Sequence, residues 1–353
     1  MKVDSTAGYG MQDSAKGAKE IEDFGYSGTM TAEVKHDPFV PLAIAAAATE
    51  RIELGTSIAV AFARTPMNLA YIANDLQIVS KGRFLLGLGT QVKAHITRRF
   101  DMAWSGHPAP QMAEMIEAMH AIWHAWETGE KLDFQGDYYS HTLMTPMFTP
   151  EPHPFGRPKV FCAAVGAVMT EVTARVADGL LPHGFSTEQY FREVTLPAVE
   201  KGLARSGRSR DDFEISAPGF LVTGGTEEAF NESKEAVRKQ ISFYGSTPAY
   251  KPVFEVHGWG ELGDQLHRLS VSSDADKWDK MATLVDDDVL HTFAVVAEPD
   301  KVADAILERY GDVVDRLHLS RIAGLGDEQM QSILTQLQAA DRATLAAAKT
   351  AKG

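Results

Sequence analysis

The chain has 353 residues, of which 44% are hydrophobic and 23% are charged, and its formal net charge is −14 at pH 7. These values are typical of a folded globular protein, and an acidic balance without a basic cluster argues against a nucleic-acid partner. The first residues lack the apolar core of a signal peptide, no apolar run is long enough to cross a bilayer, and the single cysteine, Cys162, has no partner for an internal disulfide. We therefore expect a cytoplasmic protein that contacts neither membrane nor nucleic acid.

Short strand-like runs alternate with segments of helical periodicity along the chain. The strand-like runs are 1–5, 27–33, 52–60, 83–87, 160–165, a run that starts at 180, 213–222 and 316–322. Helical segments lie between them; one begins with Thr65 as N-cap and Pro66 in the first turn, and another covers 190–203, where Pro197 predicts a kink. Alternating strands and helices predict a parallel sheet, and eight units favour a closed (β/α)₈ TIM barrel.

An open dinucleotide-binding sheet is the main alternative. It needs the glycine pattern G-x-G-x-x-G after a strand, and the nearest run, 87–92, lacks the third glycine. We predict one domain over 1–353. Two stretches, 95–147 and 244–292, exceed the minimal unit, and we expect these insertions to cover the active-site mouth.

Active sites of such barrels lie at the carboxyl ends of the strands, which selects candidate residues. After the second strand come Glu33, His36 and Asp37. A carboxylate and an imidazole suit proton transfer, although Glu33 is equally compatible with a solvated loop acid or a helix cap. Asp37 precedes Pro38 and is expected to cap the next helix.

Further candidates follow the other strands. They are Ser57, Ile58 and Arg64; Gly89, Thr90, Gln91, His95 and Arg98; Ala163, Ala164, Val165 and Gly166; His183 and Gly184; Thr223 and Gly224. Gly89 and Gly166 each precede a helix, where backbone N–H groups can hold a phosphate, but either glycine also suits a tight turn. Arg98 and Arg99 either grip an anionic tail or form a solvated face.

The sequence offers little support for a metal site or for a catalytic nucleophile. His120 and His124 are four residues apart, but the run between them lacks the glutamate of the zinc-protease motif. The Met- and Trp-rich stripe around them is typical of a core, and Cys162 in a buried strand favours packing. We expect no metal site.

Four runs together resemble the bacterial-luciferase-like superfamily, and within it the coenzyme F420-dependent oxidoreductases. They are 33–55 (EVKHDPFVPLAIAAAATERIELG), 55–58 (GTSI), 81–91 (KGRFLLGLGTQ) and 163–179 (AAVGAVMTEVTARVADG). The resemblance covers nearly the whole chain, in order. It implies a (β/α)₈ barrel with insertions, often paired as a homodimer through helices 2 and 3.

The resemblance also implies a cofactor site. A deazaflavin or flavin ring would lie at the strand carboxyl ends, against a non-proline cis peptide that corresponds here to Ser57–Ile58. The residues implied to contact the cofactor are Glu33, Thr56, Ser57, Ile58, Gly89, Thr90, Gln91, His95, Ala163, Ala164, Val165 and Gly166. Many relatives have a histidine directly after the acidic residue; here Val34 occupies that position, so the acid–base residue is Glu33 or His36.

The implied activity is hydride transfer between coenzyme F420 and a small organic substrate. The alternative on the same barrel is an FMN-dependent monooxygenase that uses reduced flavin and O₂. A barrel hydrolase would need a metal cluster or paired carboxylates, which the sequence does not offer, and a non-catalytic binding protein is a further alternative.

Overall fold

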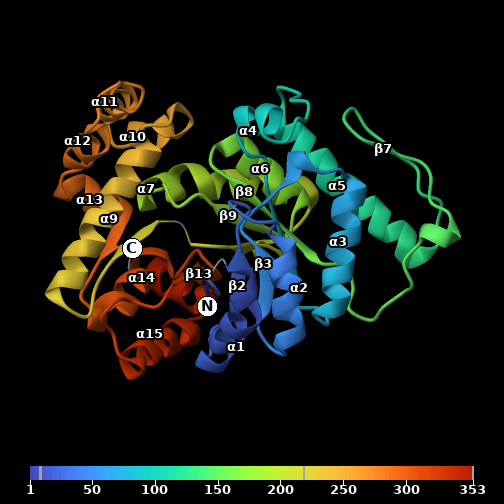
Figure 1. Ribbon diagram of the computed structural model, residues 1–353, viewed down its shortest axis with the longest axis horizontal. Helices are drawn as coiled ribbons and strands as arrows, with labels where there is room; N and C mark the ends of the chain where they lie inside the picture. The colour runs from blue at the N-terminus through green and yellow to red at the C-terminus, as the bar shows by residue number, and fades with distance from the viewer. Residues whose placement is uncertain (8–9, 218, 352–353) are drawn as a thin grey trace.

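The computed structural model describes residues 1–7, 10–217 and 219–351, and it contains a parallel eight-stranded barrel surrounded by helices (Figure 1). The barrel strands are β1 (Lys2–Ser5), β2 (Gly28–Thr31), β3 (Glu53–Thr56), β5 (Phe84–Gly89), β8 (Lys159–Ala164), β9 (Gly179–Pro182), β10 (Glu214–Ile215) and β13 (Arg316–His318). They are hydrogen-bonded in the order β10-β9-β8-β5-β3-β2-β1-β13. A parallel bridge between Ser216 and Arg316 closes the circle, so the predicted (β/α)₈ barrel is confirmed.

The strands form because both of their faces are covered. All six residues of β5 are buried, as expected of a parallel strand between a packed barrel interior and an outer layer of helices. The outer helices are α1 (Ser14–Phe24), α2 (Phe39–Ala48), α3 (Pro66–Val79), α5 (Pro108–Thr128), α6 (Ala167–Val176), α8 (Leu196–Ser206), α9 (Glu227–Gly245), α14 (Val302–Tyr310) and α15 (Asp327–Ala339), followed by α16 (Arg342–Thr350). The predicted start of α3 is confirmed, since the Thr65 hydroxyl accepts a hydrogen bond from the Asn68 N–H.

The stretch 95–147 was expected to cover the active-site mouth, and the structure differs from this expectation. It contains most of the short helix α4 (Lys93–Arg98), then α5 and the hairpin of β6 (Phe134–Gln135) and β7 (Ser140–His141). Helix α5 packs between α3 and α6 in the outer ring, and the Trp123 indole N–H donates to the Ala70 carbonyl of α3. The Met- and Trp-rich stripe is therefore buried in the barrel wall, so α5 is not a lid over the mouth.

Two predicted strands are interrupted. The run 52–60 divides into β3 and β4 (Ala59–Val60), and 213–222 divides into β10 and β11 (Phe220–Val222). Strand β11 leaves the barrel and pairs in parallel with β12 (Ala294–Val296). The predicted helix 190–203 is also composite: α7 (Glu188–Tyr190) leads into a π-helical turn over 191–195 and then α8, and Pro197 lies in the first turn of α8.

The stretch 244–292 folds into four short helices, α10 (Lys251–Glu255), α11 (Gly260–Ser270), α12 (Lys277–Thr283) and α13 (Asp287–Phe293). With α9 they enclose a separate apolar cluster that includes Phe254, Leu266 and Phe293. This unit lies beside α7, and Thr187, in the loop after β9, hydrogen-bonds to His257 over 2.8 Å (Figure 1). The insertion thus borders the carboxyl end of the barrel on the β9 side.

The amino end of the barrel is filled by charged side chains, most of them from the first residue of a strand. Arg316 is 1% exposed; it donates to Asp4 over 2.7 Å and also pairs with Glu53 and Glu214. Lys2 and Lys159 complete the cluster through Glu53 and Glu214. Three cations therefore face three carboxylates. Within the described residues no helix is long and apolar enough to cross a membrane.

Candidate active site

The carboxyl end of the barrel is shaped by an irregular turn after β3. The Ser57–Ile58 peptide bond is cis, as the resemblance implied. The Ser57 N–H donates to the Thr31 carbonyl over 2.6 Å, and the Glu33 N–H donates to the Ile58 carbonyl over 3.1 Å. The end of β2 and the loop after it thus hold the turn from one side, and the Ser57 side chain is left exposed at the barrel mouth.

The neighbouring strand β5 accommodates this turn because it contains glycine. A Cβ atom on Gly89 would lie 2.8 Å from the Ile58 side chain, so no larger residue fits there without movement. The Thr56 hydroxyl is buried and both donates to the Gly87 carbonyl (2.6 Å) and accepts from its N–H (2.9 Å). Thr56 therefore joins two strands rather than offering its hydroxyl to a cofactor.

The loops after β5 and β8 lie on neighbouring strands. In the first, Thr90 is half-buried, Gln91 has a positive φ of 59°, and His95 is exposed on α4. In the second, Gly166 is the N-cap of α6; no side chain caps the helix, and no atom lies within 4 Å of where a Gly166 Cβ would be. Free N–H groups and open space at a helix N-terminus suit a phosphate.

Apolar side chains border the same end of the barrel. Val34 follows β2, Val92 follows β5 and Val168 lies in the first turn of α6, and they are 63%, 54% and 70% exposed. A single exposed valine is ordinary, but three on loops of one barrel end make an apolar rim suited to a flat ring.

The predicted acid–base residues differ in their surroundings. The Glu33 side chain is only 6% exposed; its Oε2 accepts from Arg64 Nη1 and from the Val60 N–H, both at 2.7 Å, and its Oε1 accepts from Arg64 Nη2 at 3.1 Å. Arg64 also binds Asp37, which accepts from the Phe39 N–H and so caps α2 as predicted. His36 is exposed, and its ring makes no hydrogen bond in the described part of the chain.

Two further histidines lie at the strand ends. His183, after β9, stacks on Tyr250, and its Nδ1 accepts from the Phe185 N–H; burial lowers the pKa of His183 to about 4. His318 ends β13, and its Nε2 lies 3.4 Å from the Thr6 hydroxyl after β1. Part of the His318 side chain is exposed to solvent. Protein surrounds the rest of the ring and removes part of its hydration, which lowers the pKa of His318. Both rings are neutral at pH 7. The sequence prediction placed His318 inside a longer strand and missed it.

Positive charge collects on the loop after β2 and on the segment after β5 that contains α4, and these two segments touch each other. Arg99 donates to the Val34 carbonyl over 3.1 Å and so links the loop after β5 to the loop after β2. Lys35, Lys93, Arg98 and Arg99 are all exposed, and none forms an ion pair with a described residue. We call these four the cationic loop residues. In a chain of net charge −14, a group of unpaired cations has the charge that suits an anionic ligand.

The residues present therefore fit a flat heteroaromatic cofactor that carries phosphate. An exposed turn and an apolar rim can contact the ring, and the α6 N-terminus can receive the phosphate. Among the described residues no cluster of three or more His, Cys, Asp or Glu side chains could hold a metal ion.

A family model described as luciferase-like monooxygenase matches residues 3–316. The chain belongs to this family. An uncharacterized protein of Mycobacterium tuberculosis is 50% identical over 317 residues, which cover 90% of this chain and 92% of the relative. The F420-dependent glucose-6-phosphate dehydrogenase of Intrasporangium calvum is 33% identical over 187 residues, which cover 51% of this chain and 53% of that enzyme.

Solved structures agree with the luciferase-like fold. The coenzyme F420-dependent tetrahydromethanopterin reductase of Methanopyrus kandleri superposes with a TM-score of 0.73 at 18% identity, over 96% of this chain and 98% of that one. At this identity the likeness concerns the fold alone. Together with the family match, these findings identify an oxidoreductase or monooxygenase of the luciferase-like family.

Proposed function

We propose that this luciferase-like protein transfers a hydride between coenzyme F420 and a small organic substrate. The observation that carries the proposal is the group of unpaired cationic loop residues, since F420 bears a longer anionic side chain than FMN. The relationship to an F420-dependent dehydrogenase supports the same choice. When bound, the deazaflavin supplies a ring carbon that accepts or releases hydride.

The chain's own residues would hold this cofactor from three sides. The ring would rest against Ser57 and Ile58, within the apolar rim. The N–H groups at the start of α6 would bind its phosphate, and Lys93 and Arg98 would face its anionic tail. Holding the ring and substrate at a fixed separation would supply most of the rate enhancement.

Proton transfer is assigned to His36 rather than to Glu33. Both carboxylate oxygens of Glu33 already accept hydrogen bonds from Arg64 or Val60, so we propose that Glu33 positions the turn after β3. His36 has an unengaged ring on the loop after β2. His36→Asn should therefore lower kcat and change its pH profile while cofactor affinity stays within about twofold.

The cofactor assignment is tested by titrating the cofactor-free chain with F420 and with FMN. We expect F420 to bind more tightly, and the double substitution Lys93→Glu/Arg98→Glu should weaken it at least about tenfold at low salt. Lys131→Glu changes an exposed charge beyond the end of α5 and serves as the matched control, with affinity unchanged.

The second candidate is an FMN-dependent monooxygenase, which the family description itself favours. The same titration separates the two. Micromolar binding of FMN without binding of F420 would reject the first proposal and leave the monooxygenase in its place.

A further inference from the structure

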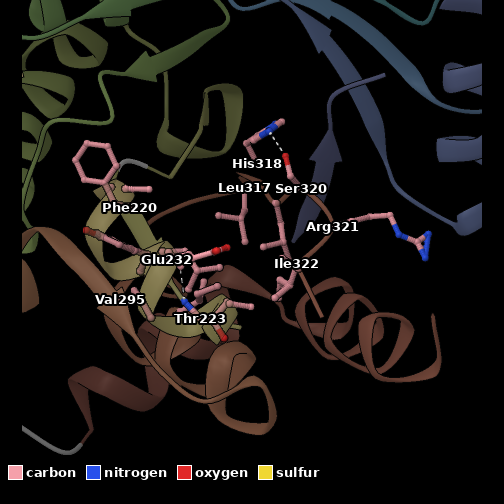
Figure 2. A pocket seen from close by; sticks show the side chains of 18 residues that line it. Phe220, Thr223, Glu232, Val295, Leu317, His318, Ser320, Arg321 and Ile322 are labelled. Carbon is pink, nitrogen blue, oxygen red and sulfur yellow. Dashed lines mark hydrogen bonds between the residues drawn. The ribbon is translucent and has the colours of Figure 1, made fainter. Parts of the chain in front are cut away.

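A cavity of about 450 Å³ opens between β13 and β11, where β11 leaves the barrel (Figure 2). The two sides of this opening meet at the Ser216–Arg316 bridge, after which β11 turns away to pair with β12, and they meet again where the Gly225 N–H donates to the Ala323 carbonyl. Helices α9 and α14 and the segment after β13 close the space. Its lining is mostly apolar and includes Leu221, Val295, Ile306, Leu317 and Ile322.

Two buried hydroxyl groups line this apolar cavity without a hydrogen-bond partner. Thr223 is 6% exposed and Tyr310 is 3% exposed, and neither Thr223 Oγ1 nor Tyr310 Oη has a partner among the described residues. Burial raises the pKa of Tyr310 to about 12, so its hydroxyl stays protonated and able to donate. A buried hydroxyl without a partner costs free energy, and a bound molecule would remove that cost.

The charges around the cavity favour an uncharged ligand. The Arg321 side chain points away from it, pairs with Asp327 and lies over the Phe24 ring (Figure 2). Glu232 is exposed at the opposite wall and forms no ion pair with a described residue. His318 also lines the cavity, and its pKa is lowered, so this ring is neutral at pH 7. Among the residues that line the cavity, an anionic ligand would therefore meet a carboxylate rather than a cation.

We propose that this cavity binds a small, uncharged and mostly apolar organic molecule that hydrogen-bonds through a hydroxyl or carbonyl group to Thr223 or to Tyr310. The volume lies within the range of about 300–1,000 Å³ typical of small-ligand sites. The proposal does not depend on the cofactor assignment, because none of the proposed ring- or phosphate-binding residues lines the cavity.

The experiment compares two probes of nearly the same shape, 2-naphthol and naphthalene, by their fluorescence on titration with the full-length chain. We expect 2-naphthol to bind more tightly, because only its hydroxyl can hydrogen-bond to one of the two buried groups. Thr223→Val/Tyr310→Phe should weaken 2-naphthol binding about tenfold and leave naphthalene binding unchanged. The same substitutions should leave the unfolding temperature equal or higher, since they remove unpartnered hydroxyls.

The matched control is Thr173→Val/Tyr26→Phe, which removes two other buried, unpartnered hydroxyls that do not line the cavity. It should leave both probe affinities unchanged. Ala229→Phe places a ring at the cavity wall and should abolish binding of both probes. Equal affinity of the two probes for the unmodified chain, or an unchanged 2-naphthol affinity in Thr223→Val/Tyr310→Phe, overturns the proposal. So does binding of neither probe, which would mean that the cavity holds only water.

Discussion

The two ends of the barrel use polar side chains in opposite ways. At the amino end, six charged groups from β1, β3, β8, β10 and β13 are paired with one another around Arg316. At the carboxyl end, Ser57, His36 and the α6 N-terminus are left without side-chain partners in the described structure. Charged groups that are paired with one another stabilise a fold, whereas groups without side-chain partners are available to a ligand. The residues that stabilise the barrel therefore lie at its amino end, and those available for binding lie at its carboxyl end.

The strongest way to break the amino end is to remove its central cation. Arg316→Met leaves three carboxylates with only Lys2 and Lys159 to balance them, and a buried charge without its partner is costly. The free energy of unfolding should fall by about 3–5 kcal/mol, measured by denaturant titration. Arg175→Met removes a half-exposed partner of Glu117 and should cost less than about 1 kcal/mol. A fall of similar size in both variants would contradict the comparison.

The same cluster predicts how stability depends on acid. Burial opposes ionisation of Glu214, but Lys2, Lys159 and Arg316 outweigh it and lower its pKa to about 2. Because this pKa is lower in the folded chain, the ionised carboxylate stabilises the fold above about pH 4.5, and that contribution is lost as the pH falls towards 2. Glu214→Gln should flatten this acid loss, which is on the order of 2 kcal/mol, in unfolding measurements between pH 7 and 3.

The pKa of Asp4 is shifted in the opposite direction to that of Glu214. Burial is the largest influence and raises its pKa, although Arg316 lowers it. Protonation of Asp4 therefore favours the folded chain as the pH falls, and partly compensates for the loss at Glu214. Asp4→Asn should remove this compensation and steepen the acid loss, which is the reverse of the Glu214→Gln result.

Glu33 tests whether a residue near the mouth belongs to the fold or to the site. Glu33→Gln replaces one acceptor of the Arg64 pair by a donor, so the free energy of unfolding should fall by about 1–3 kcal/mol. Glu130→Gln, at an exposed pair with His124, should change it by less than about 0.5 kcal/mol. If Glu33 is instead the proton donor, turnover will fall while stability stays constant.

The alternation of strands and helices predicted the barrel and pointed to the mouth, because both depend on local periodicity. The positions at which strands stop depend on tertiary pairing instead. Strand β11 leaves the barrel to pair with β12, which lies about 70 residues further along the chain. Local sequence does not show such a distant partner, so the sequence predicted a single strand over 213–222. Strand β13 likewise loses its neighbour on the β10 side after Arg316 and pairs with β1 alone as far as His318, whose ring lies at the mouth.

The roles of individual side chains were harder to predict for the same reason. Glu33 followed a strand, as a catalytic acid would, but its Arg64 partner comes from 31 residues further along the chain. The stripe of α5 has the apolar composition of a lid, yet contacts with α3 and α6 bury it in the wall. Sequence spacing selects the loops of a site, and only packing decides which of their side chains remain free.

The smallest expected change in stability sharpens the comparison most, because it concerns two adjacent residues. The Thr56 hydroxyl is buried between β3 and β5, so Thr56→Val should cost about 1–2 kcal/mol of unfolding free energy. The Ser57 hydroxyl is exposed and makes no hydrogen bond to a described residue, so Ser57→Ala should change it by less than about 0.5 kcal/mol.

Cofactor affinity should show the reverse order for these two variants. Ser57→Ala should weaken F420 binding several-fold, and Thr56→Val should leave it nearly unchanged in protein that is still folded. Stability must be measured without cofactor, since a bound ligand adds its own contribution to the free energy of unfolding. Weaker cofactor binding in Thr56→Val than in Ser57→Ala would mean that the turn acts through its rigidity and not through the Ser57 side chain.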